Sequence, residues 1–127
     1  MISHTMLGTN DLEKAVGFYD KVLGELGYPR VRKSGGAAAY GPKEDGPPIF
    51  WICKPHDREP AGVGNGTHVA FMAPDRASVD RFHAAALAQG GADEGAPGLR
   101  DYGPHYYGAY VRDLDGNKIQ ACCLKPE

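Results

Sequence analysis

A segment that recurs with a spacing of 64 residues constrains the fold of this chain more than any other feature. The pattern of residues 4–11 returns in residues 68–75, and the register continues beyond them without a gap. The residues shared by the two segments are of types that fit particular roles: a polar side chain in a strand, a helix cap, two apolar core residues and a glycine that ends a helix. The repeat therefore predicts two copies of one strand-and-helix unit. Five positions are identical: His4 and His68, Asp11 and Asp75, Phe18 and Phe82, Leu23 and Leu87, Gly27 and Gly91.

The length of 127 residues suits one domain that holds both copies. We divide it into a first module over about residues 1–55, a linker over 56–65 and a second module over about 66–127. The linker is rich in proline, glycine and polar residues, and it is too short to separate independent domains. The two modules are therefore predicted to pack against each other.

Each module is predicted to contain a strand, a helix and then two or three strands, which makes the fold class α+β. In the first module we expect a strand over 2–9 and a helix that begins at Asn10 or Asp11. Three further strands are expected between residues 28 and 54. The last of them, 49–53, is continuously apolar, which indicates a strand buried on both faces.

The second module is predicted to begin with a strand over 67–73, followed by a helix that Asp75 caps. Residues 92–105 are rich in glycine and proline and are interpreted as loop. Strands over 106–113 and 118–124 then form a hairpin around the turn sequence Asp115-Gly116-Asn117.

Composition excludes several classes of function. The net charge of −2 gives no reason to expect nucleic acid or an anionic membrane as a partner. No apolar run approaches the roughly 20 residues that span a bilayer, and the first residues do not resemble a secretory signal. Cys53, Cys122 and Cys123 form no disulfide framework, so we expect reduced thiols in a cytoplasmic protein.

The paired units, the histidine in each opening strand and the segment Val111-Arg112-Asp113-Leu114-Asp115-Gly116-Asn117-Lys118-Ile119 resemble the vicinal oxygen chelate superfamily. This group contains glyoxalase I, bleomycin-resistance proteins and extradiol dioxygenases. The resemblance implies two βαβββ modules in tandem, whose curved mixed sheets enclose a cleft. It also implies a small-molecule ligand and a homodimer. Four segments are similar to a bacterial glyoxalase-like subgroup: 50–52, 66–71, 95–98 and 106–109.

In superfamily members that hold a metal, the ligands come from the first and last strands of each module. That resemblance assigns His4, His68 and Gln120 to the metal-ligand positions for a divalent Zn, Ni, Mn or Fe ion. Gln120 stands where a glutamate is usual, and Trp51 stands nearest to the fourth position. Two carboxylate ligands are therefore absent, and no catalytic residue is assigned.

Three functions follow from the resemblance. The first is metal-assisted lyase or isomerase chemistry on a 2-oxo compound or thiol adduct, in the manner of lactoylglutathione lyase. The alternative is a metal-free protein of the bleomycin-resistance type, which binds and sequesters a compound. The third is an extradiol dioxygenase, against which the missing iron-binding carboxylate argues.

Aromatic residues supply the flat surfaces that would bind a planar ligand. For each tyrosine the alternative is packing in the core, and for His105 it is an exposed loop. Arg100 and Asp101 could orient an anionic ligand, although we favour an exposed ion pair between them. The ligand-binding candidates are Trp51, Tyr40, Tyr106, Tyr107 and His105, with Tyr110 as a further aromatic in the same stretch.

Overall fold

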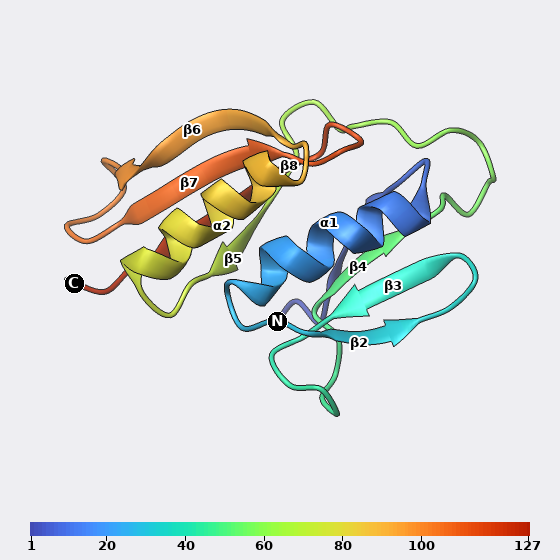
Figure 1. Cartoon of the computed structure of the whole chain (residues 1–127), viewed down its shortest axis with the longest axis horizontal. Helices are drawn as coiled ribbons and strands as arrows, with labels where there is room; N and C mark the ends of the chain where they lie inside the picture. The colour runs from blue at the N-terminus through green and yellow to red at the C-terminus, as the bar shows by residue number, and fades with distance from the viewer.

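The structure is a computed structural model, and it describes all residues from 1 to 127. It contains eight strands and two helices (Figure 1). In chain order these are β1 (Thr5–Gly8), α1 (Leu12–Gly24), β2 (Arg30–Lys33), β3 (Ala37–Tyr40), β4 (Phe50–Cys53), β5 (His68–Met72), α2 (Arg76–Ala88), β6 (Ala92–Leu99), β7 (Tyr107–Arg112) and β8 (Lys118–Cys123).

The strands form two four-stranded sheets of the same topology. The order is β1-β4-β3-β2 in one sheet and β5-β8-β7-β6 in the other. In each sheet the first and last strands of the module pair in parallel, and the other pairs are antiparallel. This arrangement confirms the α+β fold with two tandem βαβββ modules that the repeat and the resemblance predicted.

Aspartates begin both helices, at equivalent positions of the repeat. The Asp11 side chain accepts a hydrogen bond from the backbone N–H of Lys14, so Asp11 and not Asn10 is the cap of α1. Asp75 does the same for the N–H of Ser78 at the start of α2. Each helix packs its apolar side on one face of its own sheet, and the two helices lie side by side (Figure 1).

A buried polar network joins the two modules. Asp113, which follows β7, accepts a hydrogen bond from the hydroxyl of Tyr19 on α1. Its other partners include the side chain of Asn117, which also donates to the carbonyl of Gly8 at the end of β1. Gly116 has a φ of 89°, which the tight turn between β7 and β8 requires. The turn predicted between these strands therefore also holds the modules together.

Two predictions about the strands were wrong in detail. Residues 92–99 are not loop: they form β6, the edge strand of its sheet, with register irregularities on both sides of Gly95. An edge strand with bulges tolerates the glycines and proline that suggested a loop. The strand at 50–53 is not buried on both faces, because Phe50 and Ile52 are buried while Trp51 and Cys53 are partly exposed.

All three cysteines are free, and Cys122 and Cys123 are buried. Neither helix is both long and apolar enough to cross a membrane.

Candidate functional site

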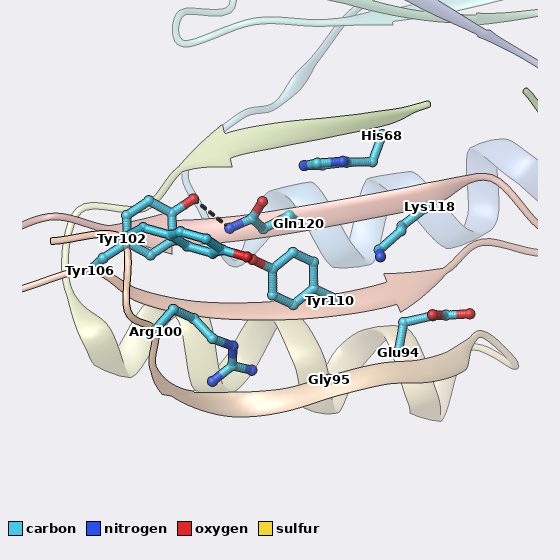
Figure 2. Close-up of a pocket in the computed structure, with 9 residues that line it drawn as sticks. All are labelled: His68, Glu94, Gly95, Arg100, Tyr102, Tyr106, Tyr110, Lys118 and Gln120. Atoms are coloured by element: carbon cyan, nitrogen blue, oxygen red, sulfur yellow. Dashed lines mark hydrogen bonds between the residues drawn. The ribbon is translucent and has the colours of Figure 1, made fainter. Parts of the chain in front are cut away.

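The candidate site lies on the face of the second sheet that points away from the helices (Figure 2). Side chains alternate between the two faces of a strand. Ile119 and Val111 therefore enter the core under α2, while Gln120 and Tyr110 lie on the open face. These two residues are direct partners across β7 and β8, and Gln120 also pairs with Ala70 of β5. The open face thus carries one continuous row of residues from three strands.

A pocket of about 420 Å³ occupies this face. Strand residues form its floor, and the segment between β6 and β7 forms one wall. A Cβ added to Gly95 would lie 3.0 Å from the Tyr110 ring, so a larger residue at this position would displace the ring. The lining residues are His68, Glu94, Gly95, Arg100, Tyr102, Tyr106, Tyr110, Lys118 and Gln120.

Gln120 is the buried polar residue at the centre of the pocket, with 1% of its surface exposed. Its amide nitrogen Nε2 donates a hydrogen bond of 2.7 Å to the hydroxyl of Tyr106 (Figure 2). Its amide oxygen Oε1 accepts no hydrogen bond from the protein, and Arg76 Nε is the only fully buried side-chain polar atom without a partner. The Gln120 oxygen is therefore free to accept a hydrogen bond from a ligand.

Burial raises the pKa of the Tyr106 hydroxyl, and the hydrogen bond from Gln120 acts in the opposite direction. The pKa of Tyr110 is also raised, chiefly by burial. Both phenols are therefore neutral at physiological pH, and each presents a hydroxyl that can donate and accept hydrogen bonds.

The Tyr110 ring lies between two cations. The guanidinium carbon of Arg100 is 5.5 Å from the ring centre, and the ammonium nitrogen of Lys118 is 5.2 Å from it (Figure 2). The ring of His68 meets the same tyrosine edge-on, with 6.2 Å between the ring centres. A planar apolar surface with polar and positive groups at its border is typical of a site for a small organic ligand.

The structure does not bring the three predicted metal ligands together within one chain. His68 and Gln120 share the pocket, but His4 is exposed near the start of β1, where its ring nitrogen Nδ1 hydrogen-bonds the Ser3 hydroxyl. Trp51 lies on the other sheet, beside Met6. No group of three or more His, Cys, Asp or Glu side chains could hold a metal ion. One chain therefore offers a metal one imidazole, one amide oxygen and the Glu94 carboxylate, which Arg112 already binds, and this set does not fit a stable site.

The predicted ligand-binding residues are also divided. Tyr106 lines the pocket. Tyr40 is fully buried in the core of the first module, and its hydroxyl donates to Asp20. Tyr107 takes the opposite side of β7 from Tyr110, where its hydroxyl donates to Asp80 on α2. His105 is exposed in the turn before β7 and does not line the pocket.

Four pocket residues were not predicted from the sequence as part of a site: Glu94, Gly95, Tyr102 and Lys118. The strand alternation that identified Gln120 also places Lys118 on the same face, so the signal for it was present. The ion pair favoured between Arg100 and Asp101 is not formed, because Arg100 instead donates hydrogen bonds to the carbonyls of Ala96 and Leu99.

Comparisons with known proteins agree on one family. The model of the glyoxalase/bleomycin resistance protein/dioxygenase superfamily matches residues 1–121. A glyoxalase/bleomycin resistance protein from Albidiferax ferrireducens T118 is 41% identical, with a TM-score of 0.84 over 95% of this chain and 96% of that one. The lactoylglutathione lyase of Agrobacterium tumefaciens is 26% identical, with a TM-score of 0.67 over 97% of this chain and 92% of that one. No functionally curated protein matches the chain.

Proposed function

Since the chain belongs to the glyoxalase/bleomycin resistance protein/dioxygenase superfamily, we propose that it binds a small planar organic molecule in the pocket of its second module. In this proposal the protein acts as a metal-free binding or sequestration protein of the bleomycin-resistance type. The observation that carries it is the lining of the pocket by three tyrosines around a buried glutamine with a free amide oxygen.

Different groups of the pocket recognise different parts of the ligand. The rings of Tyr102, Tyr106 and Tyr110 offer flat surface to a planar ligand, which gains free energy by leaving water. The Gln120 amide oxygen and the tyrosine hydroxyls fix the orientation of its polar groups. Tyr102 is exposed, and its ring meets Tyr106 edge-on at 5.3 Å between centres, so it is placed to cover a bound ligand.

Metal-assisted lyase or isomerase chemistry on a 2-oxo compound or thiol adduct is the second candidate. It is favoured by the similarity to a lactoylglutathione lyase and by the shared pocket of His68 and Gln120. The donor set of one chain does not fit a metal, and the usual carboxylate is replaced by a neutral amide. For this reason the binding function is our first proposal.

We also propose that the protein is a homodimer in the cytoplasm. The open face of the first sheet exposes apolar side chains, among them Met6 with 54% of its surface accessible. The partly exposed Trp51 lies beside it, and exposed apolar side chains that lie together are typical of an interaction site. The free cysteines support a reducing compartment.

The binding function is tested by titration of the protein with 2-naphthol, a neutral planar probe, followed by calorimetry and by NMR shifts of residues in β7 and β8. Replacement of Tyr110 in Tyr110→Leu should weaken binding by about five- to tenfold, because one aromatic contact is worth about 1 kcal/mol. The control Tyr28→Leu changes a half-buried tyrosine outside the pocket and should leave affinity unchanged. Absence of 2-naphthol binding, or equal losses in both variants, would contradict the proposal.

A further inference from the structure

The charges around the pocket narrow the class of ligand. We infer that the ligand is a planar organic anion, in which the aromatic part lies against Tyr110 and the negative group is bound by Lys118, with Arg100 as a second cation at the border of the same ring. This inference rests on the proposed binding function and adds the charge of the ligand to it.

The pocket has more positive than negative side chains. Lys118 and Arg100 both line it, and neither forms an ion pair with a carboxylate of the protein. The single acidic lining residue, Glu94, is held at 2.8 Å by Arg112, which neutralises it. The hydrogen bond from Arg112 is the first cause of the lowered pKa of Glu94, and the charges of Arg112 and Lys118 lower it further. Two cations therefore remain for an anionic ligand.

Arg100 is fixed in position before any ligand arrives. Its two terminal nitrogens donate to the carbonyls of Ala96 and Leu99, at 2.6 and 3.3 Å. These carbonyls orient the guanidinium without cancelling its charge, and a guanidinium has five N–H donors. The unused donors can bind a carboxylate with little loss of side-chain entropy.

Both cations lie at the border of one aromatic ring, that of Tyr110. A ligand that combines an aromatic ring with an attached carboxylate matches this pattern, because the ring can lie on the tyrosines while the carboxylate reaches a cation. A neutral ligand would leave the two charges without a partner in a partly desolvated pocket, and a cationic ligand would be repelled.

The position of Lys118 also indicates where the anionic group lies. Lys118 and His68 line a second cavity of about 360 Å³, formed by the segment between Val63 and Thr67. These two residues therefore stand between the aromatic pocket and a polar one. An elongated ligand can place its ring among the tyrosines and its anionic group beside Lys118, at the junction of the two cavities.

The test uses two probes of almost the same size and shape, 2-naphthoate and 2-naphthamide. At neutral pH the first carries one negative charge and the second none. We expect the wild-type protein to bind 2-naphthoate about five- to tenfold more tightly by calorimetry, because its carboxylate can form a charge-assisted hydrogen bond that the amide cannot. The preference should decrease as salt is added, because ions screen charges that water can reach.

Lys118→Met keeps the apolar stem of the side chain and removes its charged end, so it should reduce the preference to about twofold or less while 2-naphthamide still binds. Lys43→Met is the matched control: Lys43 lies in an exposed loop outside the pocket, and this variant should keep the full preference. Thermal melts of both variants show whether they remain folded.

The outcomes separate the two proposals. If neither probe binds, the binding function itself is wrong, and the charge of the ligand falls with it. If both probes bind the wild-type protein equally, the binding function stands and the anionic ligand is excluded. A preference that survives in Lys118→Met, or that disappears in Lys43→Met as well, would also overturn the role of Lys118.

Discussion

Gln120 is the residue on which the chemistry of the pocket depends most. It lies at the centre of the open face, buried, with its amide nitrogen committed to Tyr106 and its oxygen free. A carboxylate at this position would accept the tyrosine hydrogen bond and offer a strong ligand to a divalent ion. The amide instead donates its hydrogen bond to the tyrosine and is a weak metal ligand, so it forms a neutral hydrogen-bonding surface. The amide in place of a carboxylate therefore supports the proposed binding function over a metal centre.

The variant Gln120→Glu should bind Ni²⁺ or Zn²⁺ more tightly than the wild-type protein. We expect a gain of about tenfold or more, because the new carboxylate joins His68 in one pocket and loss of an oriented metal contact costs a similar factor. Calorimetric titration with each metal measures the change. Gln89→Glu is the matched control, since it adds the same charge at the exposed end of α2. An equal gain in both variants would show that the effect comes from net charge alone.

Tyr19 is the residue through which the first module reaches the buried network of the second. Burial raises the pKa of its hydroxyl well above the ordinary value, with the Asp113 charge as the next cause, so the hydroxyl stays a donor. Tyr19→Phe should lower the free energy of unfolding by about 1–3 kcal/mol, because one oxygen of buried Asp113 loses a partner. Urea denaturation measures this decrease in the free energy of unfolding. Tyr28→Phe, which loses an exposed hydrogen bond to Met72, should cost clearly less.

At the scale of single elements, the start of α2 gives the stability a dependence on pH. Hydrogen bonds from the side chain and the backbone of Ser78 lower the pKa of Asp75 below its ordinary value of 3.8. The unfolded chain therefore binds this proton at higher pH than the folded one. The contribution of Asp75 to stability is fully present above the ordinary pKa and is lost as the pH falls through the lowered value.

The variant Asp75→Asn should accordingly show a smaller fall in Tm between neutral pH and about pH 3 than the wild-type protein, because asparagine still caps a helix but does not titrate. Asp45→Asn is the control, since the Asp45 side chain makes no hydrogen bond and its replacement should leave the pH profile unchanged. Calorimetric melts across this range measure both. Parallel profiles for the wild-type protein and Asp75→Asn would contradict the cap's role in the acid sensitivity.

The elements also show what the sequence could predict. The hairpin of β7 and β8 was predictable because its turn is strongly signalled and its apolar residues alternate, which also placed Gln120 on one face. Strand β6 was not predictable. Its Gly95 and Pro97 are typical of a loop, but a bulged strand at the edge of a sheet tolerates them. Tyr40 shows how sensitive such reasoning is to register: its neighbour Ala39 pairs with Trp51, while Tyr40 itself enters the core.

The pocket was less predictable than the fold because part of it comes from a segment outside the regular strands. Gln120 and His68 come from regular strands, whose alternation can be followed along the sequence. Tyr102 and Arg100 come from the segment between β6 and β7, and only the folded chain brings them over Tyr110. A loop residue carries no periodic signal, so Tyr102 was missed, and Tyr106 and Arg100 were considered for their chemistry alone and not for their position.

At the scale of the whole molecule, the two sheets are related by the repeat but differ in their open faces. The second sheet carries the polar and aromatic pocket. The first exposes His4 and Met6 on the same face as the half-buried Trp51. The segment between Gly62 and Thr67 borders this face beside Met6, yet Met6 keeps 54% of its surface exposed. In the proposed homodimer, a second copy of the chain covers this face.

The homodimer predicts a mass in solution of twice the 13.6 kDa of the chain, measured by light scattering after gel filtration. Met6→Glu should shift this mass toward that of one chain, because it places a charge in an interface that excludes water, at a position exposed enough to leave the fold intact. Leu87→Glu makes the same change at an exposed leucine of α2 and should leave the dimer unchanged. A wild-type protein with the mass of one chain would contradict the dimer, and so would a Met6→Glu variant that stays dimeric. In either case the first sheet would have another role, and the pocket of the second module would have to bind its ligand with the residues of one chain alone.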